Sequence, residues 1–247
     1  MSALLAAEIL KLRTTRLLLW LGLILAGVVA LSVVGTIATA GEFGEAFGSF
    51  NWESTVVSAA GIATLFALLA GVLSLTAEYR HGTVAWTFLA TPKRERVVLA
   101  KAAVSALAGA GLAVLAAVVA LAIAIPWLSA RGMPLDVGSG ELWRNVGGLL
   151  VGCAFWAAFG VGLGGIIRNQ VAAVVVALIW FPVLEPLIGA INNEVGRYLP
   201  SAAVEAMLGG AGTADPLPRP TATALTVAYV AVFLAAGAFL ASRRDVT

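Results

Sequence analysis

Six long apolar runs constrain the fold of this chain more than any other feature of its sequence. A helix needs about 20 apolar residues to cross the hydrocarbon core of a bilayer. Backbone groups in such a run must find their hydrogen-bond partners within the segment, which favours helices. We therefore predict an all-α integral membrane protein, a single domain over residues 1–247. The predicted transmembrane helices are 17–39, 55–77, 102–125, 146–167, 171–191 and 222–241.

The amino-acid composition excludes a soluble fold. Hydrophobic residues make up 61% of the chain and charged residues 11%, whereas soluble domains contain about 25% charged residues. A soluble protein of this size could not bury so many apolar side chains. The first run, 17–39, is also longer than the apolar core of a signal peptide, which spans about 7–15 residues. We therefore expect it to be retained as a helix.

The charged residues between the runs differ on the two sides of the predicted membrane. Connections that include residues 1–16, 78–101 and 168–170 hold most of the Lys and Arg residues, and the opposite connections hold most of the Asp and Glu residues. Cytoplasmic loops carry the excess of Lys and Arg. Both termini are therefore predicted to be cytoplasmic, which agrees with an even number of spans.

Two shorter helices are predicted outside the spans. Residues 1–16 place several apolar side chains near helical spacing, with charged residues between them. This pattern favours an amphipathic helix on the inner membrane surface. On the outer side, Pro200 precedes the helix-forming residues 201–208, and Gly209 follows as a stop signal. We expect a short outer helix there, between the fifth and sixth spans.

The connection 78–101, between the second and third spans, is the most distinctive segment. Gly82 can adopt the left-handed conformation that ends a helix, and Thr83 can cap a short cytoplasmic helix after it. Pro92 suits the first position of the next helix. A solvated loop that binds lipid headgroups is the alternative. The residues that the short helix would present to the cytoplasm include Trp86 and Thr87.

The sequence shows no arrangement of residues typical of an enzyme. It contains neither the phosphate-binding loop G-x-x-x-x-G-K-[ST] nor the zinc motif H-E-x-x-H. The single histidine, His81, and the single cysteine, Cys153, lack partners for a metal site. The basic runs are too short to bind nucleic acid. We expect no catalytic residue, no metal and no cofactor on this chain, and no nucleic-acid partner.

One string of residues lies across the end of the second span and the start of the third. Its members are Glu78, Arg80, His81, Gly82, Thr83, the run Leu89-Ala90-Thr91-Pro92, Arg94 and Lys101. In this order and at this place in the topology, the string resembles the signature of type-2 ATP-binding-cassette (ABC) transporter permeases. These are six-helix subunits of bacterial drug and natural-product exporters. Residues 184–187 and 198–203 resemble the same family.

The resemblance implies a dimer of permeases, a homodimer or a heterodimer, in which each copy engages a separately encoded ATPase subunit. That ATPase, and not this chain, would bind ATP and Mg. The complex would lie in the bacterial cytoplasmic (inner) membrane. The N-terminal helix and the helix after Gly82 would sit in a groove on the ATPase. The residues implied in this coupling are Glu78, Arg80, Gly82 and Thr83 at the turn, Trp86 and Thr87 at the contact, and Pro92 and Arg94 beyond it.

Glu185 is the one ionisable residue within a predicted span, and such residues are costly in lipid. Pro182 and Pro186 flank it, so we predict that the helix breaks there, near the outer surface. Glu185 could then accept hydrogen bonds from freed backbone N–H groups or pair with Arg197. We favour this structural role over proton or substrate binding.

Aromatic residues of the fourth and fifth spans could line a path for a substrate, and ordinary helix packing is the alternative. The candidates for this path are Phe155, Trp156, Phe159, Trp180 and Phe181. On the fourth span, Gly148, Gly152, Gly160 and Gly164 recur at multiples of four residues. They predict a smooth stripe that allows close contact with another helix.

Three functions remain open on the sequence. The leading hypothesis is the permease subunit of an ABC exporter, moving an amphipathic or lipid-like substrate. A self-contained channel, scramblase or carrier is the second. Secondary carriers tend to have polar groups near the midplane, and these spans are nearly free of charge there. The third is a membrane anchor or assembly protein.

Overall fold

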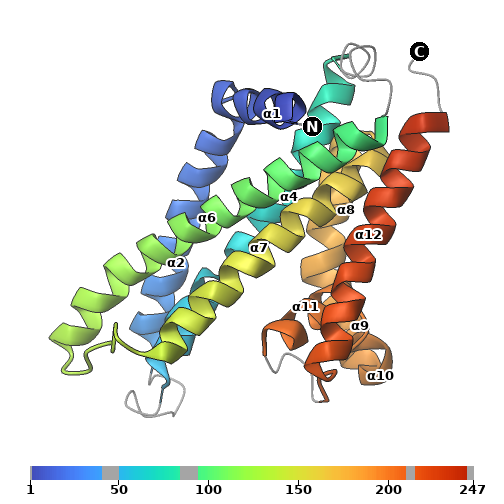
Figure 1. Cartoon of the computed structure of the whole chain (residues 1–247). Coiled ribbons are helices and arrows are strands. Elements are labelled where there is room, and N and C mark those ends of the chain that lie inside the picture. The colour runs from blue at the N-terminus through green and yellow to red at the C-terminus, as the bar shows by residue number, and fades with distance from the viewer. Residues whose placement is uncertain (1, 41–49, 84–93, 210–214, 244–247) are drawn as a thin grey trace.

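The computed structural model describes residues 2–40, 50–83, 94–209 and 215–243 (Figure 1). These ranges contain helices and turns and no strand. Within them, six helical segments are long and apolar enough to cross a membrane, and each contains one of the six predicted runs. The all-α fold with six candidate spans is therefore confirmed. The segments are Leu17–Thr39, Trp52–Arg80, Glu95–Ala130, Gly140–Ile167, Gln170–Ile191 and Arg219–Ala241.

Most of the spans extend beyond the apolar runs because polar residues continue or cap the helices. The Ser139 side chain, for example, accepts hydrogen bonds from the N–H groups of Glu141 and Leu142 where the fourth span begins. The spans consist of α2 (Leu17–Thr39); α3 (Trp52–Ala59), a 3₁₀ turn (Ala60–Ile62) and α4 (Ala63–Arg80); α6 (Arg94–Ala130); α7 (Gly140–Ile167); α8 (Gln170–Ile179), a π-helical turn (Trp180–Leu184) and α9 (Glu185–Ile191); and α12 (Arg219–Arg243). The shorter helices are α1 (Ser2–Thr14), α10 (Asn193–Gly196) and α11 (Pro200–Leu208).

The central helix of the bundle is α7. It packs against α4, α6 and α12, it is the most buried of the six candidate spans, and its Phe159 and Leu142 are inaccessible to solvent. The first, fifth and sixth spans are the least buried. They expose large apolar side chains such as Leu31 and Ile191. Such exposed apolar surface suits contact with lipid rather than water.

The glycine stripe of α7 serves packing within one chain. A Cβ atom on Gly160 would overlap the Leu68 carbonyl oxygen of α4, and one on Gly164 would lie 2.9 Å from the Val72 carbonyl oxygen. The stripe therefore lets the backbones of α4 and α7 touch, which larger residues would prevent. Its other half, Gly148 and Gly152, faces α11 instead.

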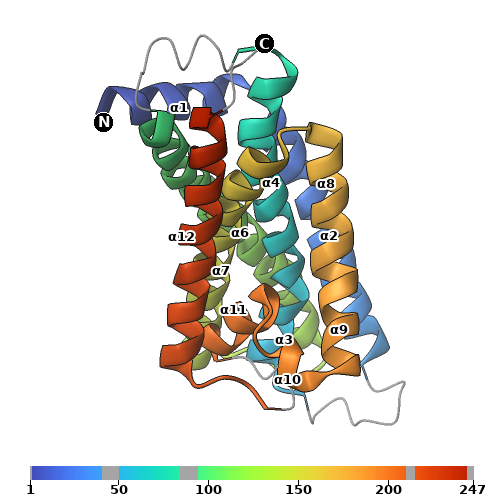
Figure 2. The same cartoon turned by 90° about the vertical axis from the view of Figure 1, so that its right-hand side faces the viewer.

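The shorter helices lie at opposite ends of the bundle. Both views place α1 across one end, where α4 and α12 also end, and place α10 and α11 at the other (Figures 1 and 2). The helix predicted over residues 201–208 is present as α11, and it ends at Gly209 with φ +87°. The helix predicted at the N-terminus is present as α1, and its position relative to a membrane stays a prediction.

The face of α1 that packs on the protein includes a charged residue. Glu8 is buried, whereas Ile9 and Leu10 are exposed. The reason is that Glu8 finds cationic partners beneath the helix. The predicted short helix after Thr83, with Trp86, Thr87 and Pro92, lies outside the described residues.

Candidate functional site

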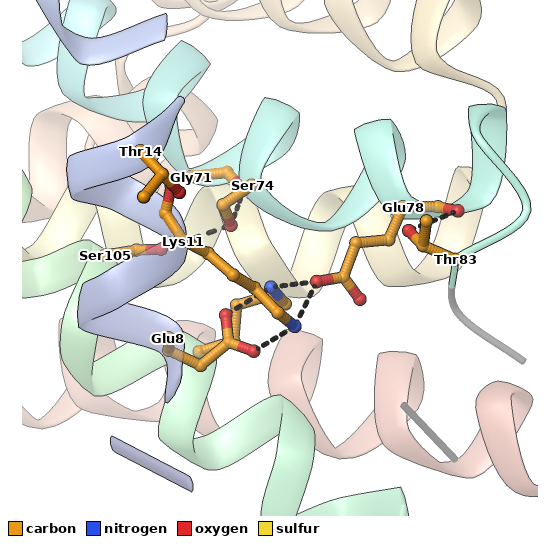
Figure 3. Close-up of polar contacts among 9 residues, drawn as sticks. Glu8, Lys11, Thr14, Gly71, Ser74, Glu78, Thr83 and Ser105 are labelled. Atoms are coloured by element: carbon orange, nitrogen blue, oxygen red, sulfur yellow. Dashed lines mark hydrogen bonds and ion pairs between the residues drawn. The ribbon is translucent and has the colours of Figure 1, made fainter. Parts of the chain in front are cut away.

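Four charged side chains meet where α1 crosses the ends of α4 and α6, and the close-up in Figure 3 shows Glu8, Lys11 and Glu78 pointing toward one another. Lys101 Nζ lies 2.6 Å from Glu8 Oε2 and 3.0 Å from Glu78 Oε1. Lys11 Nζ lies 2.7 Å from Glu8 Oε1 and 2.8 Å from Glu78 Oε1. We call these four residues the charge cluster. It joins three elements that are far apart in the sequence.

Three of the four members of the charge cluster are buried. Lys101, Glu8 and Glu78 are 3%, 4% and 8% exposed, and the Lys11 side chain is 42% exposed. Two carboxylates and two ammonium groups balance each other in charge. Removing one of the three buried members would leave the charges unbalanced in a site shielded from water, which is strongly destabilising. The cluster therefore fixes α1 in one position on α4 and α6.

The two α1 members of the cluster lie outside the candidate spans, and their pKa values reflect the ion pairs. Burial raises the pKa of Glu8, but the charge and hydrogen bond of Lys101, with those of Lys11, outweigh burial and hold it below 4.5. Burial lowers the pKa of Lys11, but the hydrogen bonds and charges of Glu78 and Glu8 outweigh it and hold it above 10.5. Both groups are therefore more firmly charged than in water.

The turn after α4 has the predicted form. Gly82 has φ +67°, and the Thr83 N–H donates to the Glu78 carbonyl oxygen over 3.0 Å. Glu78 thus braces the turn through its backbone, while its side chain belongs to the charge cluster. The Arg80 side chain points elsewhere and donates to Gln170 Oε1 at the start of α8, over 3.4 Å. Arg94 begins α6.

Sequence reasoning missed the charge cluster, although it named Glu78 and Lys101 within one motif. From the sequence alone, Lys101 is one of several basic residues predicted to be cytoplasmic. Glu8 and Lys11 are predicted to lie on the polar side of an amphipathic helix. One signal was present: Glu8 and Lys11 are three residues apart, the spacing of an intrahelical pair. The pairing of that helix with Lys101 depends on the tertiary fold.

Models of known protein families and curated proteins give no match to this chain. The resemblance to type-2 ABC permeases therefore rests on the motifs alone. No group of three or more metal-binding side chains lies together in the ranges that the structure describes.

Near the middle of α7 and of the fifth span, four of the five candidate substrate-path residues form one aromatic cluster. The Trp156 ring lies 4.9 Å from Phe181 and 5.6 Å from Phe159, and Phe155 packs 5.3 Å from Trp156. Phe159 is fully buried, which favours the alternative of ordinary helix packing for this residue. The fifth candidate, Trp180, is separate from the cluster because its indole N–H donates to Glu185 over 3.1 Å.

At the predicted break, a π-helical turn interrupts the α-helix of the fifth span, and α9 follows it directly. Pro182 lies within the turn, and Pro186 lies in the first turn of α9. Glu185 is 3% exposed, and its Oε2 accepts a hydrogen bond from the Ser201 backbone N–H over 2.9 Å. A backbone N–H is thus a partner, as predicted, but it comes from α11 rather than from the freed groups of its own helix.

The alternative pairing of Glu185 with Arg197 is wrong. Arg197 instead forms ion pairs of 2.6 Å with Glu194 and with Asp215. Glu185 therefore attaches α11 to the fifth span without a charged partner among the described residues.

A cavity of about 1010 Å³ lies beside the aromatic cluster, among the second, fourth and fifth spans, α11 and the start of α12. We call it the outer cavity, after the side of the membrane on which the sequence predicts this end of the bundle to lie. Trp156 and Phe181 line it, and Phe155, Phe159 and Trp180 do not. Its polar lining includes Glu141, Arg144, Glu205 and Arg219. It combines an apolar wall with a few polar groups, as small-molecule sites do.

Proposed function

We propose that this chain is the permease subunit of an ABC exporter in a bacterial cytoplasmic membrane. It moves an amphipathic or lipid-like substrate, and a separate ATPase subunit binds ATP and Mg and supplies the energy. A second copy of the chain, or a related one, completes the transporter. Both termini then face the cytoplasm, together with α1 and the turn at Gly82.

The charge cluster is the observation that carries this proposal. A subunit driven by a separate ATPase needs a rigid connection between the surface that the ATPase contacts and the helices that move. The cluster fixes α1 to the end of α4 and the start of α6 through four ion pairs of 2.6–3.0 Å. A displacement of α1 or of the adjoining turn would therefore move the second and third spans together.

The charge distribution supports a transporter of amphipathic molecules over an ion carrier. Ion-coupled carriers place polar groups on broken helices near the midplane. The one acid within the apolar part of a span, Glu185, is occupied by bonds to Trp180 and Ser201. A self-contained scramblase or channel is the second candidate, and the outer cavity is the observation that favours it over a simple membrane anchor.

Reconstitution separates these functions. The chain is placed in liposomes with a fluorescent phospholipid, either alone or with an ATPase that is encoded beside it and contains a phosphate-binding loop. Lipid movement that requires both ATP and the ATPase supports the proposal. Lipid movement by the chain alone, without ATP, overturns the proposal in favour of a scramblase.

A further inference from the structure

The outer cavity has two chemically different parts. Its deep part is lined by Leu65, Leu68 and Leu149 together with Trp156 and Phe181. Its other part carries charged groups from three separate elements, α7, α11 and α12. An apolar wall that adjoins fixed charges of both signs matches an amphiphile, which has an apolar body and a polar head.

The charges of the cavity are largely free to meet a ligand. Arg144, Glu205 and Arg219 are exposed and form no ion pair with any side chain in the described ranges. Glu141 accepts one hydrogen bond, from Asn51. Two arginines and two glutamates give the lining no net charge. A ligand headgroup with a single charge would be attracted by the arginines and repelled by the glutamates, or the reverse. A headgroup that carries both charges can pair with the arginines and the glutamates at once.

The position of Arg219 is defined by its contact with α11. Its guanidinium lies against Gly209, where a Cβ atom would overlap Arg219 Nη2. Gly209 has φ +87° and follows the last turn of α11. The carbonyl end of a helix favours a cation, and the Arg219 guanidinium lies at that end of α11, beside the cavity.

We propose that the outer cavity is a binding site for a single-chain amphiphile with a zwitterionic head. The chain lies against Trp156 and Phe181, the anionic part of the head meets Arg144 and Arg219, and the cationic part meets Glu205. A cavity of about 1010 Å³ is at the upper end of the range for small-molecule sites, about 300–1,000 Å³. The inference goes beyond the proposed function, because binding requires neither an ATPase nor transport.

The structure offers a way to fill the cavity without disturbing the fold. A Cβ atom on Gly61, which lines the cavity in the 3₁₀ turn, would meet nothing within 4 Å. Gly61→Phe therefore places a ring in the cavity. Ser58→Trp is a second blocking variant, because Ser58 is an exposed residue of the same wall. Gly27→Phe is the matched control, since Gly27 on α2 also has open space and lies outside the cavity.

The experiment uses the full chain in nanodiscs and a lysophosphatidylcholine with a photoreactive diazirine at the end of its chain. Mass spectrometry maps the labelled residues in variants that elute as wild type does from a sizing column. We expect labelling near Trp156 and Phe181 that falls about tenfold or more in Gly61→Phe or Ser58→Trp and persists in Gly27→Phe. Labelling confined to lipid-facing surfaces, or unchanged by both blocking variants, would overturn the proposal.

Competition by unlabelled amphiphiles tests which headgroup charge the cavity prefers. Unlabelled dodecylphosphocholine, dodecyl sulfate and dodecyltrimethylammonium share one chain and differ in head charge. We expect the phosphocholine to compete best, and Glu205→Gln to shift the preference toward the sulfate by about two- to fivefold, as for an exposed charge pair. Equal competition by all three would overturn the zwitterionic assignment. None of these outcomes depends on whether an ATPase binds the chain, so the proposed function is tested separately.

Discussion

Lys101 Nζ lies 2.6 Å from Glu8 Oε2, although the two residues are 93 positions apart in the chain. Their side chains are 3% and 5% exposed. An ion pair this well shielded holds α1 against the start of α6. Since Glu78 of α4 also contacts Lys101, one ammonium group connects three elements at the end of the bundle that we predict to be cytoplasmic.

Replacing Lys101 with Met should destabilise the protein strongly. The change leaves two buried carboxylates with only the half-exposed Lys11 as a counterion, and breaking a buried pair costs about 3–5 kcal/mol. We expect about 3 kcal/mol, because Lys11 still bonds both acids. Unfolding in detergent micelles measures the loss. Lys11→Met is the control and should cost about 1 kcal/mol or less, since that side chain is 42% exposed. An equal loss of stability in the two variants would show that Lys101 is not the main counterion of the buried carboxylates.

A double-mutant cycle tests whether Glu8 and Lys101 act as a pair. Changing both to Met removes the two charges together and leaves no isolated ion between them. The double variant should be more stable than the sum of the single effects predicts, by about 1–3 kcal/mol. Strict additivity would show that the two charges do not interact.

The attachment of α1 should depend on pH at both extremes. The pKa of Glu8 is lowered in the folded protein, so its contribution to stability is present above 4.5 and is lost as the pH falls through the folded value. The pKa of Lys11 is raised, so its contribution is present below 10.5 and is lost as the pH rises through the folded value. Protease cleavage between α1 and α2 reports the release. In the Glu8→Gln variant, cleavage between α1 and α2 should no longer increase as the pH falls. An increase at low pH equal to that of wild type would contradict this account.

The glycine stripe predicts opposite effects for two similar substitutions. Gly160→Ala should destabilise the protein by about 1–3 kcal/mol, because the added Cβ overlaps the Leu68 carbonyl oxygen. Gly111→Ala on α6 should be neutral or stabilising by up to about 1 kcal/mol, because its Cβ meets nothing within 4 Å and Ala favours a helix. Thermal unfolding of both variants gives the comparison. Equal tolerance of the two would show that α4 and α7 do not touch there.

Glu185 should behave as a structural acceptor. Glu185→Ala leaves the Ser201 N–H and the Trp180 indole N–H without their acceptor, and the expected cost is about 1–3 kcal/mol. Glu185→Gln keeps one acceptor oxygen and should cost less. Protease resistance of α11 and thermal unfolding report the difference. A Glu185→Gln variant that folds as wild type does but loses transport would instead assign this residue to transport.

The spans could be predicted because hydropathy depends only on local sequence, and the predicted run 17–39 coincides with α2. Gly82 and Gly209 were predictable for the same reason, since a left-handed position after a helix favours glycine. The partners of Lys101 were not, because Glu8 and Glu78 come from other elements, 93 and 23 positions away. The different partners of Trp180 and Phe181 could not be predicted either, because the side of the fifth span that meets α7 is decided by tertiary packing.

The most direct test of the central claim is purification of the tagged chain from native membranes under mild conditions. Wild type is compared with Arg80→Ala combined with Trp86→Ala, and with Trp20→Ala as a control on an exposed residue of α2. We predict a stoichiometric ATPase with a phosphate-binding loop that accompanies wild type and the Trp20 control and is lost from the folded double variant. Retention of the ATPase by the double variant would remove Arg80 and Trp86 from the contact. A well-folded wild-type protein that carries no ATPase would contradict the assignment as an ABC permease.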